Sequence, residues 1–255
     1  MTETDRPGGA MNRERQLAQA FVSLSDTYAA EFDPLHLFHQ LVDVCRDLLD
    51  VDAAAVMIAD ARGGLRTMAT TDDAVAFTDL LHLQNGHGPC VECYRTGRPV
   101  AVPDIAALRE RWPRVAGAMA DAGYASFHAV PMRLHERSLG ALTLVRAAPG
   151  RLREDDALVA QALADLATLA LMHWYAEPGR PDDVVTRVQS VIAAKATLEI
   201  AKGMVAEYAG TTIREAARLL AAYADRHRVR LTETAQALVE RSMELSTVLE
   251  GQPLG

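Results

Sequence analysis

No continuous helix or strand can pass through the segment AEPGRPDD, residues 176–183. Its prolines lack a backbone donor and its glycine favours turns, so the segment has the composition of a linker. At 255 residues the chain is long enough for two ordinary domains. We therefore predict a first domain at residues 16–176, a linker at residues 177–184 and a second domain at residues 185–250. Residues 1–15, rich in charge, Gly and Thr, are expected to form a disordered tail.

The charge of the chain is distributed unevenly about this linker. Residues 1–179 hold 16 arginines, no lysine and 24 acidic residues, whereas residues 180–255 hold 10 basic and 10 acidic residues. The net charge of −8 therefore lies in the first part. The second part can carry a local basic face, and both lysines of the chain, Lys195 and Lys202, fall within it.

Nothing in the sequence indicates a membrane span or an export signal. The longest apolar runs are interrupted by charges such as Asp165 and fall short of the roughly 20 apolar residues of a span. The N-terminal MTETDRPGGAMNRERQ lacks the basic and then apolar layout of a signal peptide. Three cysteines, Cys45, Cys90 and Cys93, form no spaced disulfide framework. We expect a cytoplasmic protein without structural disulfides.

Before the linker, helical and strand patterns follow one another. Helices are predicted after the Asp33–Pro34 start signal, for RWPRVAGAMADAGY, and for REDDALVAQALADLATLALMHWY. The strands AAAVMIAD and LRTMATT flank a turn at residues 62–64, and SFHAVPMRL and SLGALTLVRA flank a turn at residues 135–137. This order predicts an α+β domain with an antiparallel sheet.

Three segments of this first part, HGPCVECYRTGRPVAVPD, RWPRVAGAMADAGYASFHAVPMRL and SLGALTLVRAAPGRLREDDALVAQALADLATLAL, resemble the GAF domain of actinobacterial regulators. The resemblance implies an antiparallel sheet with flanking helices that senses a small-molecule or redox signal. It also implies a pocket between the sheet and the loop–helix region. GAF domains bind very different ligands, so the resemblance names no cofactor.

After the linker the pattern is entirely helical. Asp182 or Asp183 is the predicted cap of a long first helix, Thr212 to Glu215 form a capping box at the start of a second, and a third begins near Thr232. The first helix carries an apolar seam: Val184, Val188, Val191, Leu198 and Val205. The pattern predicts a small three-helix bundle.

The bundle resembles the ANTAR domain, an RNA-binding module of transcription antitermination regulators. The matching residues are LEIAKGMV (198–205), Glu215–Ala216, Leu220 and RLTETAQALV (230–239). The resemblance implies an all-α three-helix bundle that binds and stabilises a hairpin in nascent RNA. It also implies a homodimer, which we expect to pair through the apolar seam. The sequence departs from the family pattern at Ala221, where arginine is usual, and at Ala194–Lys195, where Ser-Arg is frequent.

The candidate RNA-binding residues are basic side chains and one glycine. They are Lys195, Lys202, Gly203, Arg226, Arg228 and Arg230. We expect the basic side chains to face solvent as one surface that neutralises phosphates, although the run DRHRVRL alone is also typical of a solvated connector. Glycine inside a helix costs roughly 1 kcal/mol relative to alanine. Gly203 is thus expected to allow close approach of the second helix or of RNA; the alternative is that it eases a bend.

The motif HGPCVEC places His87, Cys90 and Cys93 at three-residue intervals. We favour a packing role for both cysteines, because a cysteine outside a disulfide behaves as a small buried hydrophobe. Redox sensing is the alternative, since a thiol at a helix start can be reactive. Three soft ligands fall short of the four that zinc normally needs, so no metal is expected.

These features predict a signal-responsive antitermination regulator and not an enzyme. A DNA-binding regulator remains an alternative, because small trihelical bundles also fit the major groove. A cysteine-dependent redox enzyme is a further alternative, since some GAF-fold enzymes reduce free methionine sulfoxide with a cysteine pair.

Overall fold

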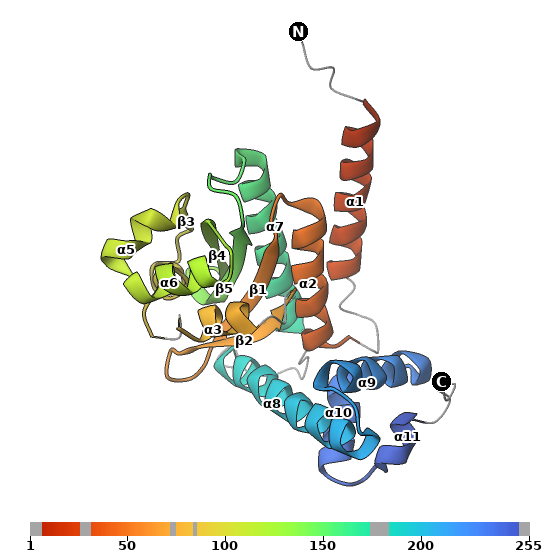
Figure 1. The fold of residues 1–255 in the computed structure, drawn as a ribbon. Coiled ribbons are helices and arrows are strands. Elements are labelled where there is room, and N and C mark those ends of the chain that lie inside the picture. The colour runs from red at the N-terminus through yellow and green to blue at the C-terminus, as the bar shows by residue number, and fades with distance from the viewer. Residues whose placement is uncertain (1–6, 26–31, 72–74, 84–85, 174–183, 250–255) are drawn as a thin grey trace.

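The computed structural model describes residues 7–25, 32–71, 75–83, 86–173 and 184–249. They form two bodies, a sheet domain with helices on both of its faces and a helical bundle next to it (Figure 1). The predicted linker up to residue 183, with its candidate caps Asp182 and Asp183, lies outside the described residues.

The sheet domain is built on a five-stranded antiparallel sheet with the strand order β2-β1-β5-β4-β3. Both predicted hairpins are present, and the first of them turns at Gly63, whose positive φ of 77° suits glycine. The predicted antiparallel α+β architecture is confirmed. The strands are β1 (Ala53–Ala59), β2 (Leu65–Thr70), β3 (Val100–Val102), β4 (Ser126–Leu134) and β5 (Arg137–Arg146).

Helices cover both faces of the sheet, and a separate hydrophobic core fills the space on each face. Alternation along β1 divides its side chains between them, because successive residues of a strand point to opposite faces: Val56 lies in one core and Met57 in the other. On the first face α2 (Pro34–Leu48) and α7 (Glu154–His173) pack against the sheet, and α1 (Pro7–Ser25) packs on these two helices. The second carries α3 (Val75–Leu83), α4 (Pro89–Thr96), a 3-10 turn (Ile105–Ala107), α5 (Leu108–Arg111) and α6 (Pro113–Asp121).

One expectation about the helices is wrong. Part of the expected disordered tail, residues 7–15, belongs to α1. This helix is held to the domain because the Arg13 guanidinium pairs with the buried carboxylate of Asp156 on α7, and Leu24 is fully buried. The helix expected for RWPRVAGAMADAGY is present as α6, which begins at Pro113 because Trp112 leaves the helical conformation and separates it from α5.

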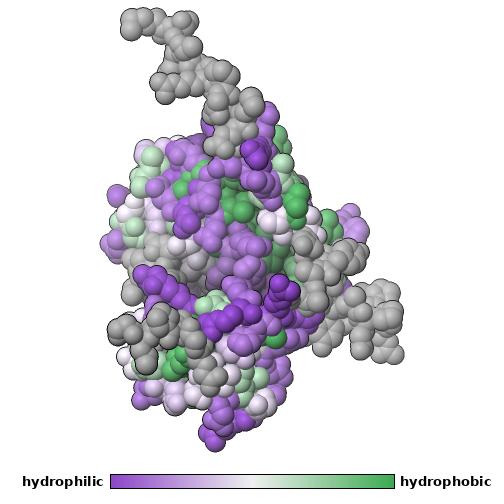
Figure 2. All heavy atoms as spheres, turned by 90° about the vertical axis from the view of Figure 1, so that its right-hand side faces the viewer, coloured by the Kyte–Doolittle hydropathy of each residue, from purple (hydrophilic) through white to green (hydrophobic). Residues whose placement is uncertain are grey.

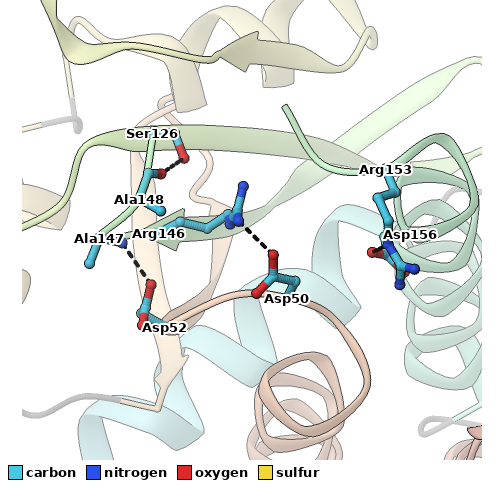
Figure 3. Close-up of polar contacts among 8 residues, drawn as sticks. All are labelled: Asp50, Asp52, Ser126, Arg146, Ala147, Ala148, Arg153 and Asp156. Carbon is cyan, nitrogen blue, oxygen red and sulfur yellow. Dashed lines mark hydrogen bonds and ion pairs between the residues drawn. The ribbon is translucent and has the colours of Figure 1, made fainter. Parts of the chain in front are cut away.

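Polar contacts fasten the end of α2 to the end of β5 (Figure 3). The Arg146 guanidinium lies 2.5 Å from the Asp50 carboxylate, and the Ala147 amide donates to the Asp52 carboxylate at 2.6 Å. Asp50 and Asp52 lie between the end of α2 and the start of β1, so these contacts join the C-terminal end of α2 to the sheet.

The helical bundle consists of α8 (Val184–Ala209), α9 (Ile213–His227), α10 (Leu231–Val239) and α11 (Leu245–Leu249). Thr212 caps α9 as predicted, since its hydroxyl accepts from the Glu215 amide at 3.1 Å. The expected third helix ends at Val239, and a short further helix follows the turn at Arg241, whose φ is 58°.

The apolar seam of α8 packs inside the chain itself. Val188, Val191, Leu198 and Val205 are each at most 5% exposed and belong to the same continuous core as the first face of the sheet domain. The seam is therefore not free to pair with a second copy, and the expectation that it forms a dimer interface is wrong.

Candidate nucleic-acid interface

The last turn of α9 and the residue that ends this helix carry the most exposed of the candidate arginines. Arg226 and Arg228 are both exposed, and Arg228 adopts a left-handed conformation, with φ 53°, that ends α9. Just before it, the Tyr223 and His227 rings stack at 4.3 Å between centroids. Figure 2 shows the side of the molecule with α1 and α9, where strongly hydrophilic side chains gather between the two bodies.

Arg230 differs from these two arginines. It is partly buried, and its Nη1 lies 3.3 Å from the Glu233 carboxylate one turn later. Its Nε is buried without a hydrogen-bond partner. Arg230 is therefore positioned by α10 and is less accessible to a ligand than Arg226 or Arg228.

The two candidate lysines lie on α8 and are paired with one carboxylate. The Glu199 carboxylate forms ion pairs with Lys195 at 2.7 Å and with Lys202 at 2.9 Å. Burial alone would raise the pKa of Glu199, but the two lysines hold it below its ordinary value. Only 19% of the Lys195 side chain and 13% of the Lys202 side chain are exposed. The expectation that Lys202 faces solvent is wrong.

The α2 helix of the sheet domain lies beside these lysines. Its His39 is partly buried, with Nδ1 3.1 Å from the Leu35 carbonyl oxygen. Burial, followed by the charges of Lys195 and Lys202, lowers the pKa of His39 from 6.5 to about 4. The lysines are thus close enough to α2 to be felt electrostatically across the contact between the two bodies.

A groove of about 230 Å³ lies between the first part of α2 and the α9–α10 region. Its walls include Asp33, His36 and Gln40 from one body and Ala221 and Asp225 from the other. Ala221, the departure from the family pattern, therefore faces the sheet domain, and its small side chain leaves room for the groove.

Gly203 lies next to Lys202 with open space around its Cα. A Cβ added there would have no neighbouring atom within 4 Å. The second helix of the bundle, α9, therefore does not approach this glycine closely, and that part of the expectation is wrong. Close approach of RNA remains a prediction.

Two family models match the chain in sequence. The GAF domain matches residues 33–172, more than half of the chain, and the ANTAR domain matches residues 186–239. The chain belongs to the GAF family and carries an ANTAR domain after its GAF domain. This pairing of a sensor domain with an RNA-binding domain is that of a signal-responsive antitermination regulator.

Solved structures with the fold of the GAF domain share little sequence with it. The GAF domain of a phosphoenolpyruvate-protein phosphotransferase from Coxiella burnetii is 20% identical with a TM-score of 0.52, covering 64% of this chain and 95% of that chain. The free methionine-R-sulfoxide reductase from Neisseria meningitidis is 17% identical with a TM-score of 0.52, covering 68% and 95%. These likenesses show the fold alone.

No curated protein matches the chain. Among the described residues, no helix is long and apolar enough to cross a membrane.

The cysteine motif of the GAF domain does not form a cluster with its histidine. Cys90 and Cys93 are fully buried in the second core, whereas His87 is exposed. Cys90 Sγ lies 3.0 Å from the Thr143 hydroxyl, and burial raises the pKa of the Cys90 thiol to about 12. Burial also raises the pKa of Cys93. Both thiols are therefore protonated at neutral pH and poor nucleophiles.

The space between the sheet and α3–α6, where the family resemblance implied a pocket, is filled by the second core. A hollow of about 500 Å³ opens instead among the helices, lined by His87, Trp112 and Arg114 among others. In the part of the chain that the structure describes, no group of three or more His, Cys, Asp and Glu side chains could hold a metal ion.

Three features of the interface between the GAF and ANTAR domains are not predicted from the sequence: the roles of Glu199 and His39 and the second hydrogen bond of Asp33. Glu199 lies four residues after Lys195 and three before Lys202, a helical spacing that puts the three on one face and could have been recognised. His39 carries no local signal. The Asp33–Pro34 start signal predicts the cap of α2, but the second bond of Asp33, to the Thr232 amide of α10, depends on tertiary docking alone.

Proposed function

We propose that this protein is a transcription antitermination regulator whose ANTAR domain binds an RNA hairpin, under the control of a signal at the GAF domain. The observation that carries the proposal is the exposed pair Arg226 and Arg228, which lies at the C-terminal end of α9, within the ANTAR match. Guanidinium groups grip phosphate oxygens in two places at once, and such contacts supply most non-specific affinity for nucleic acids.

Discrimination among RNAs comes from another source. Unpaired loop bases can be splayed out and stacked, and the stacked pair of Tyr223 and His227 lies on the same turn as the arginines. A hairpin held in this way is stabilised against refolding, so a competing terminator does not form and polymerase continues. Because the transcript is bound as it leaves polymerase, the protein acts in the cytoplasm.

The test is a gel shift with a structured RNA hairpin and with duplex DNA of the same sequence. We expect tighter binding of the hairpin, and Arg226→Ala with Arg228→Ala should weaken that binding and reduce its dependence on salt. Arg218→Ala is the matched control, since Arg218 is an exposed arginine of α9 that pairs with Glu215. Preference for duplex DNA would replace this proposal by the DNA-binding alternative.

We propose that Cys90 and Cys93 serve packing and not catalysis. A nucleophilic cysteine needs a thiolate that substrate can reach, and neither buried thiol meets this requirement. A turnover assay with free methionine sulfoxide should therefore give no product above the buffer control. Turnover that is lost on replacing both cysteines by serine would contradict this role.

The homodimer stays a prediction from the family resemblance, and it needs a face other than the buried seam of α8. Light scattering of the full chain, with and without the hairpin, measures it directly. The signal at the GAF domain is likewise a proposal, and the hollow beside His87 and Trp112 offers space for a small molecule.

A further inference from the structure

One carboxylate, that of Asp33, caps helices of both domains. Its Oδ1 accepts from the Leu35 amide at 2.8 Å and from the His36 amide at 3.4 Å, both in the first turn of α2. Its Oδ2 accepts from the Thr232 amide at 2.8 Å, in the first turn of α10. The residue is only 4% exposed. The start of the GAF domain is therefore bonded to the start of the third helix of the ANTAR domain.

The α10 helix depends on this carboxylate for its cap. The first amides of a helix have no partner within the helix, and a side-chain oxygen normally accepts from one of them. The residue at the N-cap position of α10 is Arg230, whose side chain makes no capping bond there and has no acceptor. Asp33 supplies the missing acceptor from the other domain, with a charge that suits the positive end of the helix.

The same helix, α2, faces the two lysines of the ANTAR domain. Lys195 and Lys202 are more than four-fifths covered and share the carboxylate of Glu199. Their charges lower the pKa of His39, two turns after Asp33 on α2. The lysines therefore lie near the contact between α2 and α8.

We propose that Asp33 is a latch that holds the ANTAR domain against α2 in a state of low RNA affinity. The inference rests on the proposed function, because it assigns a control to the same RNA-binding domain. Opening the bond between Asp33 and Thr232 lets α2 separate from the bundle and uncovers Lys195 and Lys202 for phosphate. A signal at the GAF domain acts on the latch through α2, which is fastened to the sheet at its other end by Asp50 and Asp52.

Two variants of the full chain break the bond from opposite sides. Asp33→Asn keeps an acceptor for α2 but loses the charge that holds α10. Thr232→Pro removes the donated amide and leaves Asp33 and the net charge unchanged. Proline is tolerated in the first turn of a helix, where Thr232 is the second residue. The matched control is Asp104→Asn, since Asp104 caps a short helix of the GAF domain through the Ala106 amide, and the substitution changes the net charge equally.

We expect Asp33→Asn and Thr232→Pro each to bind a hairpin RNA about tenfold more tightly than the parent and the control, because a bond to a charged group is lost from the closed state alone. Hydrogen exchange should also become about tenfold faster across α10 and residues 195–205, with little change in α7. Circular dichroism checks folding, and Thr232→Pro carries the test alone if Asp33→Asn loses α2.

The failure of the latch and that of the proposed function give different results. If the parent binds the hairpin and both variants bind it equally well, the latch is overturned and the RNA-binding function stands. Faster exchange without tighter binding also overturns the latch. If neither the parent nor any variant binds structured RNA, both proposals fall.

Discussion

The two basic groups of the ANTAR domain are similar in sequence and opposite in environment. Arg226 and Arg228 lie exposed at the C-terminal end of α9, whereas Lys195 and Lys202 are mostly covered and paired with Glu199. A phosphate must reach a basic side chain to bind it, so the exposed arginines can act in the docked state and the mostly covered lysines cannot. The contrast teaches that the neighbouring domain decides which charges are available.

The largest effect should follow from removing the exposed group. Replacing Arg226 and Arg228 together by alanine should weaken hairpin binding about 100-fold, because two charge-assisted contacts are lost. The slope of log affinity against log salt should fall by about 1.5, as expected for two phosphates. Titrations at several salt concentrations measure both quantities. An unchanged slope would mean that the exposed arginines touch no phosphate, and the contrast with the lysines would lose its functional meaning.

Much of the fold could be predicted from the sequence, because it depends on patterns among residues that are close together in the chain. The turns at residues 62–64 and 135–137 join the hairpins of the sheet, Asp33 and Thr212 cap the helices that follow them, and the alternation along the strands divides two cores. Each of these signals acts between residues close in the chain. The two family models then confirm the identity of both domains.

The site was harder to predict because its environment is made by docking. The sequence predicts a solvent-facing cation at Lys202, whereas in the folded chain only 13% of its side chain is exposed and its charge acts on His39 of α2. The apolar seam of α8 looked like a dimer interface, and the chain's own core already covers it. An amphipathic pattern indicates that one face of a helix is buried, but it does not indicate which element packs against that face. That choice depends on contacts between residues far apart in sequence, such as Asp33 with Thr232.

The environment of the covered lysines, Lys195 and Lys202, can be probed through the pH dependence of stability, because these lysines lower the pKa of His39. In the folded state the pKa of His39 lies at about 4, below its ordinary value of 6.5. Burial lowers this pKa most, the charges of Lys195, Lys202 and His36 lower it further, and the charge of Glu199 raises it. Between these two values the unfolded chain binds a proton that the folded chain does not. The stabilising contribution is therefore complete above pH 6.5 and is lost as pH falls toward 4.

We expect the parent to lose up to about 2 kcal/mol of unfolding free energy between pH 7 and pH 5 from this residue. Urea denaturation at both pH values measures it, and His39→Gln provides the reference that cannot titrate. The expected result is a steeper loss in the parent than in the variant. Equal losses of stability in the parent and in His39→Gln would contradict this prediction. They would show that His39 is not held neutral beside the covered lysines.

The lysines themselves should matter only when the interface is open. In the parent, Lys202→Ala should change hairpin affinity by less than about twofold, because the side chain is covered and paired with Glu199. In the Thr232→Pro background the same replacement should cost about tenfold, since the freed lysine now contacts phosphate. The four affinities form a double-mutant cycle. Equal effects of Lys202→Ala in both backgrounds would remove the distinction between exposed and covered charge.

The smallest effect concerns Gly203, which borders the covered group. A Cβ at this position would meet no atom within 4 Å, so Gly203→Ala creates no clash in the docked state. Alanine loses less backbone freedom on folding, and the variant should therefore be more stable by up to roughly 1 kcal/mol, as measured by urea denaturation.

If RNA approaches the backbone at Gly203 once α2 has moved away, the added methyl should weaken hairpin binding in the Thr232→Pro background and leave binding by the docked parent nearly unchanged. Arg218→Ala in both backgrounds controls for general effects on the bundle. A stabilised Gly203→Ala variant that binds the hairpin as well as its parent in both backgrounds would show that RNA does not approach this glycine, and would leave the easing of a helix bend as its role.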